Sequence, residues 1–282
     1  MGEPEVIDQL PQRLRTRVAD VEAGFSGHLA LWYTDLRRHR TYGLRPNDRF
    51  DPASTIKLFI LRELLAQVAA GRLTLDDELT MERADLVPGS GVMKDLTPGA
   101  VRLSLHDLAT LMITVSDNVA TNLLIGHLGT ASINRGAREA GCADTWLRGK
   151  LFKGRTQRSH TTPRDLGTLM TQIARRQAVG RTASAGMLDI LRREQSDLIV
   201  GRYLPYSPDD LAGDRKRWRV ASKSGSIKGH RHDVALVEGD GVRYVVALMS
   251  SGAEDLRFWP DNEGTLRLAT VARAVHDEVV AT

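Results

Sequence analysis

Hydrophobic residues near the start of the chain follow first a helical and then a strand pattern. Apolar residues at helical spacing over residues 10–24 predict an amphipathic helix. They are Leu10, Leu14, Val18 and Val21. Two hydrophobic stretches follow, over residues 27–35 and 40–44, and the charged turn between them predicts a strand pair. The chain therefore opens with a helix and two strands.

A long apolar helix is predicted next, from Asp51 to about Ala70. Asp51 suits the N-cap and Pro52 suits the first turn, whereas Gly71 ends the pattern. The middle of the chain continues as helices and loops. The helical patterns cover residues 104–115, 119–128, 132–140 and 180–193, with a further helix starting at Thr162 and Pro163.

The last third of the chain returns to strands. Residues 217–222, 233–238 and 244–250 read as three strands, and Gly239-Asp240-Gly241 makes a tight turn between the last two. A closing helix is predicted over residues 262–280. Because strands lie at both ends of the sequence and helices between them, the simplest assembly is one antiparallel sheet built from both chain ends.

The predicted fold class is therefore an α/β (α+β) sandwich with flanking helices plus an all-helical subdomain, within a single domain of residues 1–282. Residues 25–60 and 215–282 are assigned to the α/β part, and residues 61–214 to the mostly helical part.

Composition narrows the function classes. The net charge of +4 is small and spread out, and without a recognisable reading module it does not indicate nucleic-acid binding. No apolar run is long enough to span a membrane, and no metal-ligand spacing of Cys or His occurs. The N-terminus lacks the features of a signal peptide, so the chain reads as cytoplasmic, or as periplasmic or secreted if it is a trimmed mature form. A small-molecule substrate, no cofactor and no metal are expected, and the oligomeric state stays open.

The first candidate for chemistry is the pair Ser54 and Lys57 at the start of the predicted helix. A spacing of three places both side chains on one helix face. A serine hydroxyl is a weak nucleophile until a base takes its proton, and a lysine with a lowered pKa can be that base. By itself a Ser-x-x-Lys turn occurs by chance in many helices.

Two further elements support this pair. Ser116-Asp117-Asn118 offers a hydroxyl to relay a proton and an amide to hold both a lysine and a substrate amide, although each of its residues also caps helices. Lys223-Ser224-Gly225-Ser226 offers a cation, a hydroxyl and a bare backbone against which a substrate can lie flat. This tetrapeptide also reads as an ordinary surface turn. The backbone N–H groups of Ser54 and Ser226 would form an oxyanion hole.

The three elements together are typical of class A β-lactamases and penicillin-binding proteins, with Ser224 in place of the usual threonine. The sequence thus resembles the class A β-lactamase-like serine hydrolases over nearly its whole length. Further segments carry the resemblance: residues 50–57, 88–92, 103–124, 161–166 and 223–237.

This resemblance implies an active site in a cleft between an α/β sandwich and a helical subdomain. Ser54 would form the acyl-enzyme, Lys57 would act as base or proton shuttle, and Ser116 would protonate the leaving nitrogen. Asn118 would bind Lys57 and the substrate side chain. The strand residues Lys223 and Ser224 would recognise a substrate carboxylate.

One departure from the family concerns the loop before Thr161. Class A β-lactamases carry a glutamate there that positions the deacylating water, but residues 144–160 contain no glutamate. We therefore expect acylation by β-lactams with slow or absent turnover. The two hypotheses are a β-lactam hydrolase and a penicillin-binding-type D,D-peptidase, transpeptidase or esterase. His160 is a candidate substitute base, with an exposed loop histidine as the alternative.

A second cluster follows Lys223 on the same hairpin. Strand alternation puts His230 and His232 on one face and Arg231 on the other. Arg231 and His232 are accordingly candidates for the carboxylate site, with a simple surface role as the alternative.

Overall fold

The computed structural model describes residues 7–153, 159–195, 199–205, 218–239 and 241–282. Within these residues, six strands form one sheet, in the order β1-β3-β2-β8-β7-β6. They are β1 (Ile7–Gln9), β2 (His28–Asp35), β3 (Arg40–Leu44), β6 (Arg219–Ile227), β7 (His230–Gly239) and β8 (Val242–Ser251).

The predicted sheet from both chain ends is confirmed. Strand β2 pairs antiparallel with β8, so the N-terminal and C-terminal strands meet in the middle of the sheet. The hydrophobic pattern does not predict the short strand β1, which runs parallel to β3. The sheet is therefore mixed rather than wholly antiparallel.

Both faces of the sheet are buried, because hydrophobic residues occupy successive positions in the central strands. In β2, Ala30 and Trp32 pack into one core, whereas Leu29, Leu31 and Tyr33 pack into the other. Since alternate residues point to opposite faces, a strand with this composition is covered on both sides. The sheet is thus the middle layer of a sandwich.

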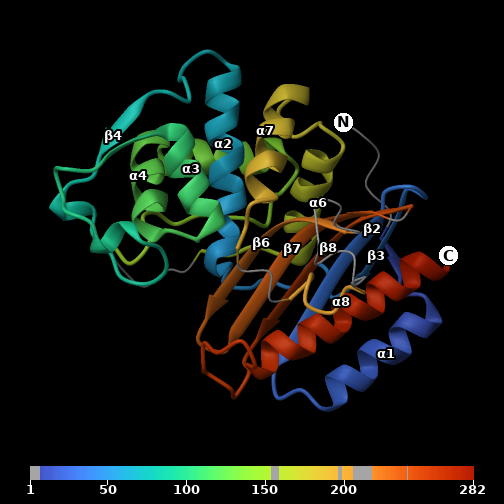
Figure 1. Ribbon diagram of the computed structural model, residues 1–282. Coiled ribbons are helices and arrows are strands. Elements are labelled where there is room, and N and C mark those ends of the chain that lie inside the picture. The colour runs from blue at the N-terminus through green and yellow to red at the C-terminus, as the bar shows by residue number, and fades with distance from the viewer. Residues whose placement is uncertain (1–6, 154–158, 196–198, 206–217, 240) are drawn as a thin grey trace.

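Helices cover the two faces of the sheet (Figure 1). On one face lie α1 (Gln12–Ala23) and α8 (Glu263–Ala281), which pack against each other. On the other lies α6 (Pro163–Ala174), which contacts β2, β7 and β8. Gly167 of α6 lies so close to Trp32 that an added Cβ would be 2.1 Å from its ring atom Cε3. Because glycine has no side chain, α6 can approach the sheet this closely.

The rest of the molecule is largely helical and lies beside one end of the sheet (Figure 1). Its helices are α2 (Lys57–Ala69), α3 (Leu105–Thr114), α4 (Asn118–Leu128), α5 (Thr130–Glu139) and α7 (Arg181–Leu191). Strands β4 (Glu78–Thr80) and β5 (Arg102–Ser104) form a small second sheet, and the 3₁₀ turns η2 (Arg83–Asp85) and η3 (Met93–Asp95) lie between them.

Helix α2 is the centre of the helical part. It packs against α3, α4, α5 and α7, and nine of its 13 residues are buried. A helix that is apolar on nearly all sides belongs inside a bundle, which explains this position. The division at residues 60 and 214 stays a prediction, and α6 packs on the sheet although it falls within the range assigned to the helical part.

Two elements near the candidate site begin or end at other residues than the sequence predicts. The helix expected from Asp51 begins as a 3₁₀ turn, η1 (Ala53–Ile56), where the Ala53 N–H donates to Asp51 Oδ1 at 3.2 Å. The strand expected to end at residue 222 continues to Ile227 as β6. Its predicted start at residue 217 and turn residue 240 lie outside the described residues.

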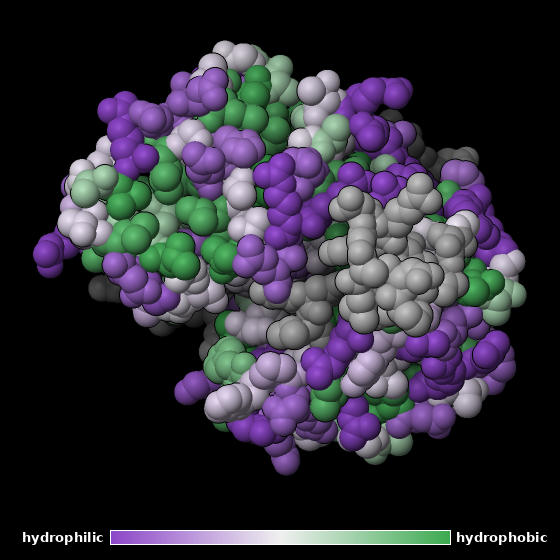
Figure 2. Space-filling model, in the orientation of Figure 1, coloured by the Kyte–Doolittle hydropathy of each residue, from purple (hydrophilic) through white to green (hydrophobic). Residues whose placement is uncertain are grey.

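Hydrophilic residues cover much of the surface in Figure 2, and its outline is indented between the helical part and the sheet. No helix within the described ranges is long and apolar enough to cross a membrane.

Candidate active site

Ser54 lies in η1, directly before the buried helix α2. The preceding residue, Ala53, has a φ of 47°, in the left-handed region that a non-glycine residue rarely adopts. Such a backbone costs on the order of 1–3 kcal/mol and is held by the surrounding structure. Ser54 also lies in the first turn, where backbone N–H groups have no acceptor within the helix. The Ala53 and Thr55 N–H groups already donate to Asp51 Oδ1 and Pro52 O, so the turn presents the Ser54 hydroxyl together with the Ser54 N–H.

Lys57 is the first residue of α2, and its side chain is fully buried. Its Nζ donates to the backbone oxygen of Ser116 at 2.6 Å, to Ser116 Oγ at 2.9 Å and to Asn118 Oδ1 at 2.9 Å. The Ser54–Lys57 turn and the Ser116-Asp117-Asn118 loop thus meet at Lys57 Nζ, although Lys57 and Ser116 are 59 residues apart in the sequence.

The surroundings of Lys57 favour its neutral form. Burial is the main cause that lowers the pKa of the Lys57 amine well below its usual value, and the positive charge of Lys223 adds to this. The carboxylates of Asp117 and Glu194 act in the opposite direction. The net result is an amine that gives up its proton far more readily than a lysine in water.

Asp117 holds the loop that carries Ser116 and Asn118. Its carboxylate accepts hydrogen bonds from Val119 N and Ala120 N at the start of α4, at 2.9 and 3.0 Å. The other oxygen accepts from the backbone N–H groups of residues 92 and 93, at 2.7 and 2.8 Å. An N-cap was the ordinary alternative for this motif, and the structure gives Asp117 that role. Ser116 itself has a φ of 55°.

The third element packs directly on the first. An added Cβ at Gly225 would lie 3.0 Å from both Ser54 N and Thr55 N, and 3.1 Å from Pro52 O. These three neighbours are backbone atoms, which cannot move aside as a flexible side chain can. Gly225 is therefore what allows β6 to approach the nucleophile's turn.

Strand β6 is the last strand of the sheet, so one of its edges faces away from β7. The Ser224 N–H donates across this edge to Glu194 Oε1 at 2.9 Å. In an antiparallel pair, N–H groups of alternate residues point to the same side. The Ser226 N–H therefore also points away from β7, on the side where Gly225 meets Ser54.

Lys223 lies beside this edge and is fully buried. Its Nζ donates to Glu194 Oε1 at 2.6 Å. Burial raises the pKa of the Glu194 carboxyl, but Lys223 and the hydrogen bonds from Ser222 and Ser224 outweigh this and hold it below its usual range. Sequence reasoning missed Glu194, because an isolated glutamate after a helix carries no spacing that links it to β6.

A cavity of about 890 Å³ opens at these elements. Of the predicted residues, Ser54, Asn118 and Ser226 form part of its wall. Phe152 and Phe258 also line it and are 65% and 62% exposed, so both present large apolar surfaces to an incoming molecule. This cavity combines the nucleophile with room for a small-molecule substrate.

The loop without a glutamate borders the cavity. Arg148, Lys150 and Lys153 are part of the wall, so the loop is basic where it reaches the site. Lys150 is partly offset by Asp85, whose Oδ1 lies 3.7 Å from its Nζ. Residues 154–158 of the loop lie outside the described residues.

His160 is half-buried at the end of this loop. Its backbone pairs with that of Trp146, and the two rings stack with centroids 6.1 Å apart. Burial, and then the charge of Arg49, lower the pKa of the imidazole below its usual value. His160 is not among the described residues that line the cavity, so its role as a substitute base stays a prediction.

Arg231 and His232 are not among the described residues that line the cavity, so their place in a carboxylate site stays a prediction. Strand β7 lies between β6 and β8, and both side chains are buried. The His232 Nε2–H donates to the Asp51 carbonyl at 2.8 Å, and burial lowers the pKa of this imidazole to about 3. Arg231 donates to the carbonyls of Ile227 and His230 at 2.8 and 2.7 Å. Both side chains support the backbone around the site.

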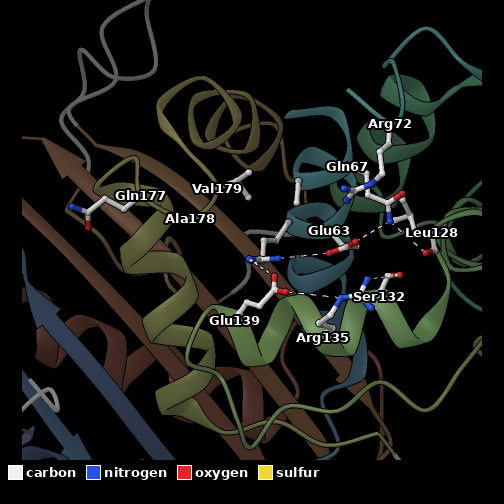
Figure 3. A pocket seen from close by; sticks show the side chains of 12 residues that line it. Glu63, Gln67, Arg72, Leu128, Ser132, Arg135, Glu139, Gln177, Ala178 and Val179 are labelled. Atoms are coloured by element: carbon white, nitrogen blue, oxygen red, sulfur yellow. Dashed lines mark hydrogen bonds and ion pairs between the residues drawn. The ribbon is translucent and has the colours of Figure 1, made fainter. Parts of the chain in front are cut away.

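A second hollow, of about 630 Å³, is lined by residues of α2 and α5 (Figure 3). Its buried residue Arg62 lies 3.6 Å from Glu63 of the same helix and 3.7 Å from Glu139, and the second ion pair joins α2 to α5. Ser54 and Lys57 are not among the described residues of its wall. We therefore assign it a structural role.

Comparison with known proteins agrees with this geometry. The sequence profile of the beta-lactamase enzyme family matches residues 13–279. The chain belongs to this family. A β-lactamase of Bacillus licheniformis is 30% identical over 242 residues, which cover 83% of this chain and 74% of that protein. A β-lactamase of Rhodobacter capsulatus is 27% identical, covering 94% and 88%. The family expected from the three sequence elements is confirmed.

Several solved structures resemble this β-lactamase-family chain over nearly its whole length. The β-lactamase of Sphaerobacter thermophilus is 28% identical, covers 96% of this chain and 98% of its own, and has a TM-score of 0.85. PBP-A is also 28% identical, covers 98% of each chain, and has a TM-score of 0.83. An ancestral class A β-lactamase, 24% identical with a TM-score of 0.82, shows the same fold. The class A β-lactamase-like fold is thus confirmed.

Proposed function

We propose that this protein is a serine hydrolase that is acylated at Ser54 by β-lactams and releases the opened product by hydrolysis. One observation carries the proposal: the buried Lys57 amine, hydrogen-bonded to Ser116 and Asn118, lies one turn from a serine on the cavity wall. A nucleophile with an adjacent base that a third group orients is the arrangement that covalent catalysis requires.

The hydrogen bonds of Lys57 support a role as general base. Two of its three acceptors, the Ser116 carbonyl and Asn118 Oδ1, can only accept. A neutral amine that donates to both has no hydrogen left for Ser116 Oγ, so its lone pair faces hydroxyl groups and can take a proton. In the proposed reaction, Ser54 Oγ bonds to the carbonyl carbon as its proton moves to Lys57 Nζ. The C–N bond then breaks as Ser116 gives its proton to nitrogen and takes one from Lys57.

The oxyanion is proposed to lie between two backbone N–H groups. Ser54 N is in the first turn of η1, and Ser226 N points from the free edge of β6. Gly225 keeps these two segments close. Removing one such donor typically costs about 10²–10³-fold in rate, so the approach of β6 to η1 matters for catalysis.

A second candidate function is a penicillin-binding-type peptidase, transpeptidase or esterase that turns over β-lactams slowly. Residues 144–160 contain no glutamate, and the described part of this loop presents cations to the cavity. PBP-A, which is 28% identical, is also known as a point mutant in an acyl-enzyme complex with penicillin G. Loss of a general base costs roughly 10²–10⁴-fold, which would convert hydrolysis into a long-lived adduct.

Hydrolysis of a chromogenic cephalosporin tests the proposal and separates the two candidates. The wild-type protein is expected to open the ring, and Ser54→Ala to abolish this reaction. Ser132→Ala, a matched change on α5 far from the nucleophile, serves as the control and should keep the wild-type rate. A single turnover followed by arrest favours the second candidate. Equal rates for wild type and Ser54→Ala contradict both.

A further inference from the structure

The strand element expected to bind a substrate carboxylate already holds a carboxylate of the protein itself. Glu194 Oε1 accepts hydrogen bonds from Lys223 Nζ at 2.6 Å, from Ser224 Oγ at 2.7 Å and from Ser224 N at 2.9 Å. Its Oε2 accepts from Ser222 Oγ at 2.6 Å. Four donors from three successive residues of β6 thus converge on one internal anion.

The charged pair in this arrangement, Lys223 and Glu194, is closed to solvent. The side chain of Lys223 is 0% exposed and that of Glu194 is 1% exposed. The ammonium and the carboxylate cancel in charge, and burial of the pair makes separating them unfavourable. Neither Lys223 nor Ser224 belongs to the described wall of the 890 Å³ cavity. A substrate anion would therefore find the cation and the donors of residues 222–224 already bound to Glu194, and the cations that line the cavity, such as Lys150 and Lys228, lie outside this strand.

The chain fixes Glu194 in place. Helix α7 ends at Leu191, whose carbonyl accepts from Glu194 N at 3.3 Å. The next residue, Gln195, donates from its backbone N–H to the carbonyl of Thr114, at the end of α3, at 3.0 Å. Glu194 is thus held from both sides by the helical part while its side chain reaches β6. The carboxylate belongs to the built site and is not a mobile surface group.

We propose that Glu194 fills the anion position of β6 from within the protein, and that the enzyme accordingly acylates neutral substrates as readily as their free acids. The inference rests on the proposed acylation of Ser54 and names its substrate class: β-lactams, amides or esters that need no carboxylate at this position. Glu194 is a specificity-determining residue in this account. It acts through Lys223 and Ser224 rather than by touching the reacting atoms.

The test compares acylation by benzylpenicillin with acylation by its methyl ester, at fixed high ionic strength. Intact-mass spectrometry at short times gives both rates. The wild-type rates are expected to agree within about tenfold. Where a lysine is available to bind the substrate carboxylate, one charged hydrogen bond is enough to make the free acid acylate the enzyme about tenfold to a hundredfold faster than its ester. A wild-type preference for the free acid of more than tenfold overturns the inference.

Glu194→Gln provides the second arm. It leaves Lys223 without its counter-charge, so the rate for the free acid relative to the ester is expected to rise about tenfold or more. Asp189→Asn, an exposed carboxylate in the last turn of α7, is the matched control and should leave the ratio unchanged. If Glu194→Gln does not fold, the wild-type ratio decides alone. Absence of any adduct with either compound overturns the proposed function itself, whereas a strong acid preference overturns only this inference.

Discussion

The contact between β6 and the nucleophile's turn leads to a sharp prediction for Gly225→Ala. The added Cβ would lie 3.0 Å from Ser54 N and Thr55 N, and 3.1 Å from Pro52 O. Those distances are shorter than ordinary carbon contacts, and all three atoms are backbone. The strand or the turn must therefore shift by a few tenths of an ångström.

The size of the effect follows from this overpacking. Extra methyl groups in a well-packed interior typically cost about 1–3 kcal/mol, and a contact with rigid backbone belongs to the upper part of that range. The same shift separates the two N–H groups proposed to hold the oxyanion. We therefore expect the acylation rate to fall by about 10²–10³-fold, the cost of losing one such donor.

Urea denaturation and stopped-flow acylation measure the two effects separately. Gly186→Ala in α7 is the matched control, because the nearest atom to its added Cβ is Leu65 Cδ1 at 3.7 Å. That change is expected to stabilise the protein by about 0.4–1 kcal/mol and to leave acylation unaltered. Wild-type stability together with wild-type acylation in Gly225→Ala would refute the reasoning about this contact.

Two more predictions concern titrating groups. Because burial lowers the pKa of Lys57, the acylation rate should rise with pH and level off at a pH well below the usual pKa of lysine. The Lys57→Arg variant should be acylated about 10²–10⁴-fold more slowly, and its rate should no longer show this pH dependence. For His232, whose pKa is about 3, the unfolded chain takes up the proton first as the pH falls below 6.5. The free energy of unfolding should thus drop by about 3 kcal/mol from this residue between pH 6.5 and pH 4. His232→Gln, compared by urea denaturation at both pH values, should lose that contribution; an unchanged slope would contradict it.

Much of the fold could be predicted from the sequence because its signals are local. Helical spacing and caps located α1, α3 and α4 to within a residue or two. The ends of η1 and β6 could not be located in the same way, because they depend on contacts between distant segments. Strand β1 has only three residues and pairs with β3, so no periodicity indicates it.

In the candidate site, too, residues with a local sequence signal could be predicted, whereas contacts between distant segments could not. Motif spacing identified Ser54, Lys57 and Asn118, and the structure brings them together. Glu194 could not be predicted, because its contact with β6 depends on how α7 ends against α3. Strand alternation separated the faces of β7, but it could not tell that both faces are covered, which is why Arg231 and His232 are both buried.

Covalent labelling of Ser54 tests the central claim most directly. The protein is incubated with benzylpenicillin, digested, and mapped by tandem mass spectrometry. The account predicts one adduct with the mass of the intact penicillin on the peptide containing Ser54, absent from Ser54→Ala. An adduct on another residue, or the same adduct in Ser54→Ala, would contradict the assignment of the nucleophile.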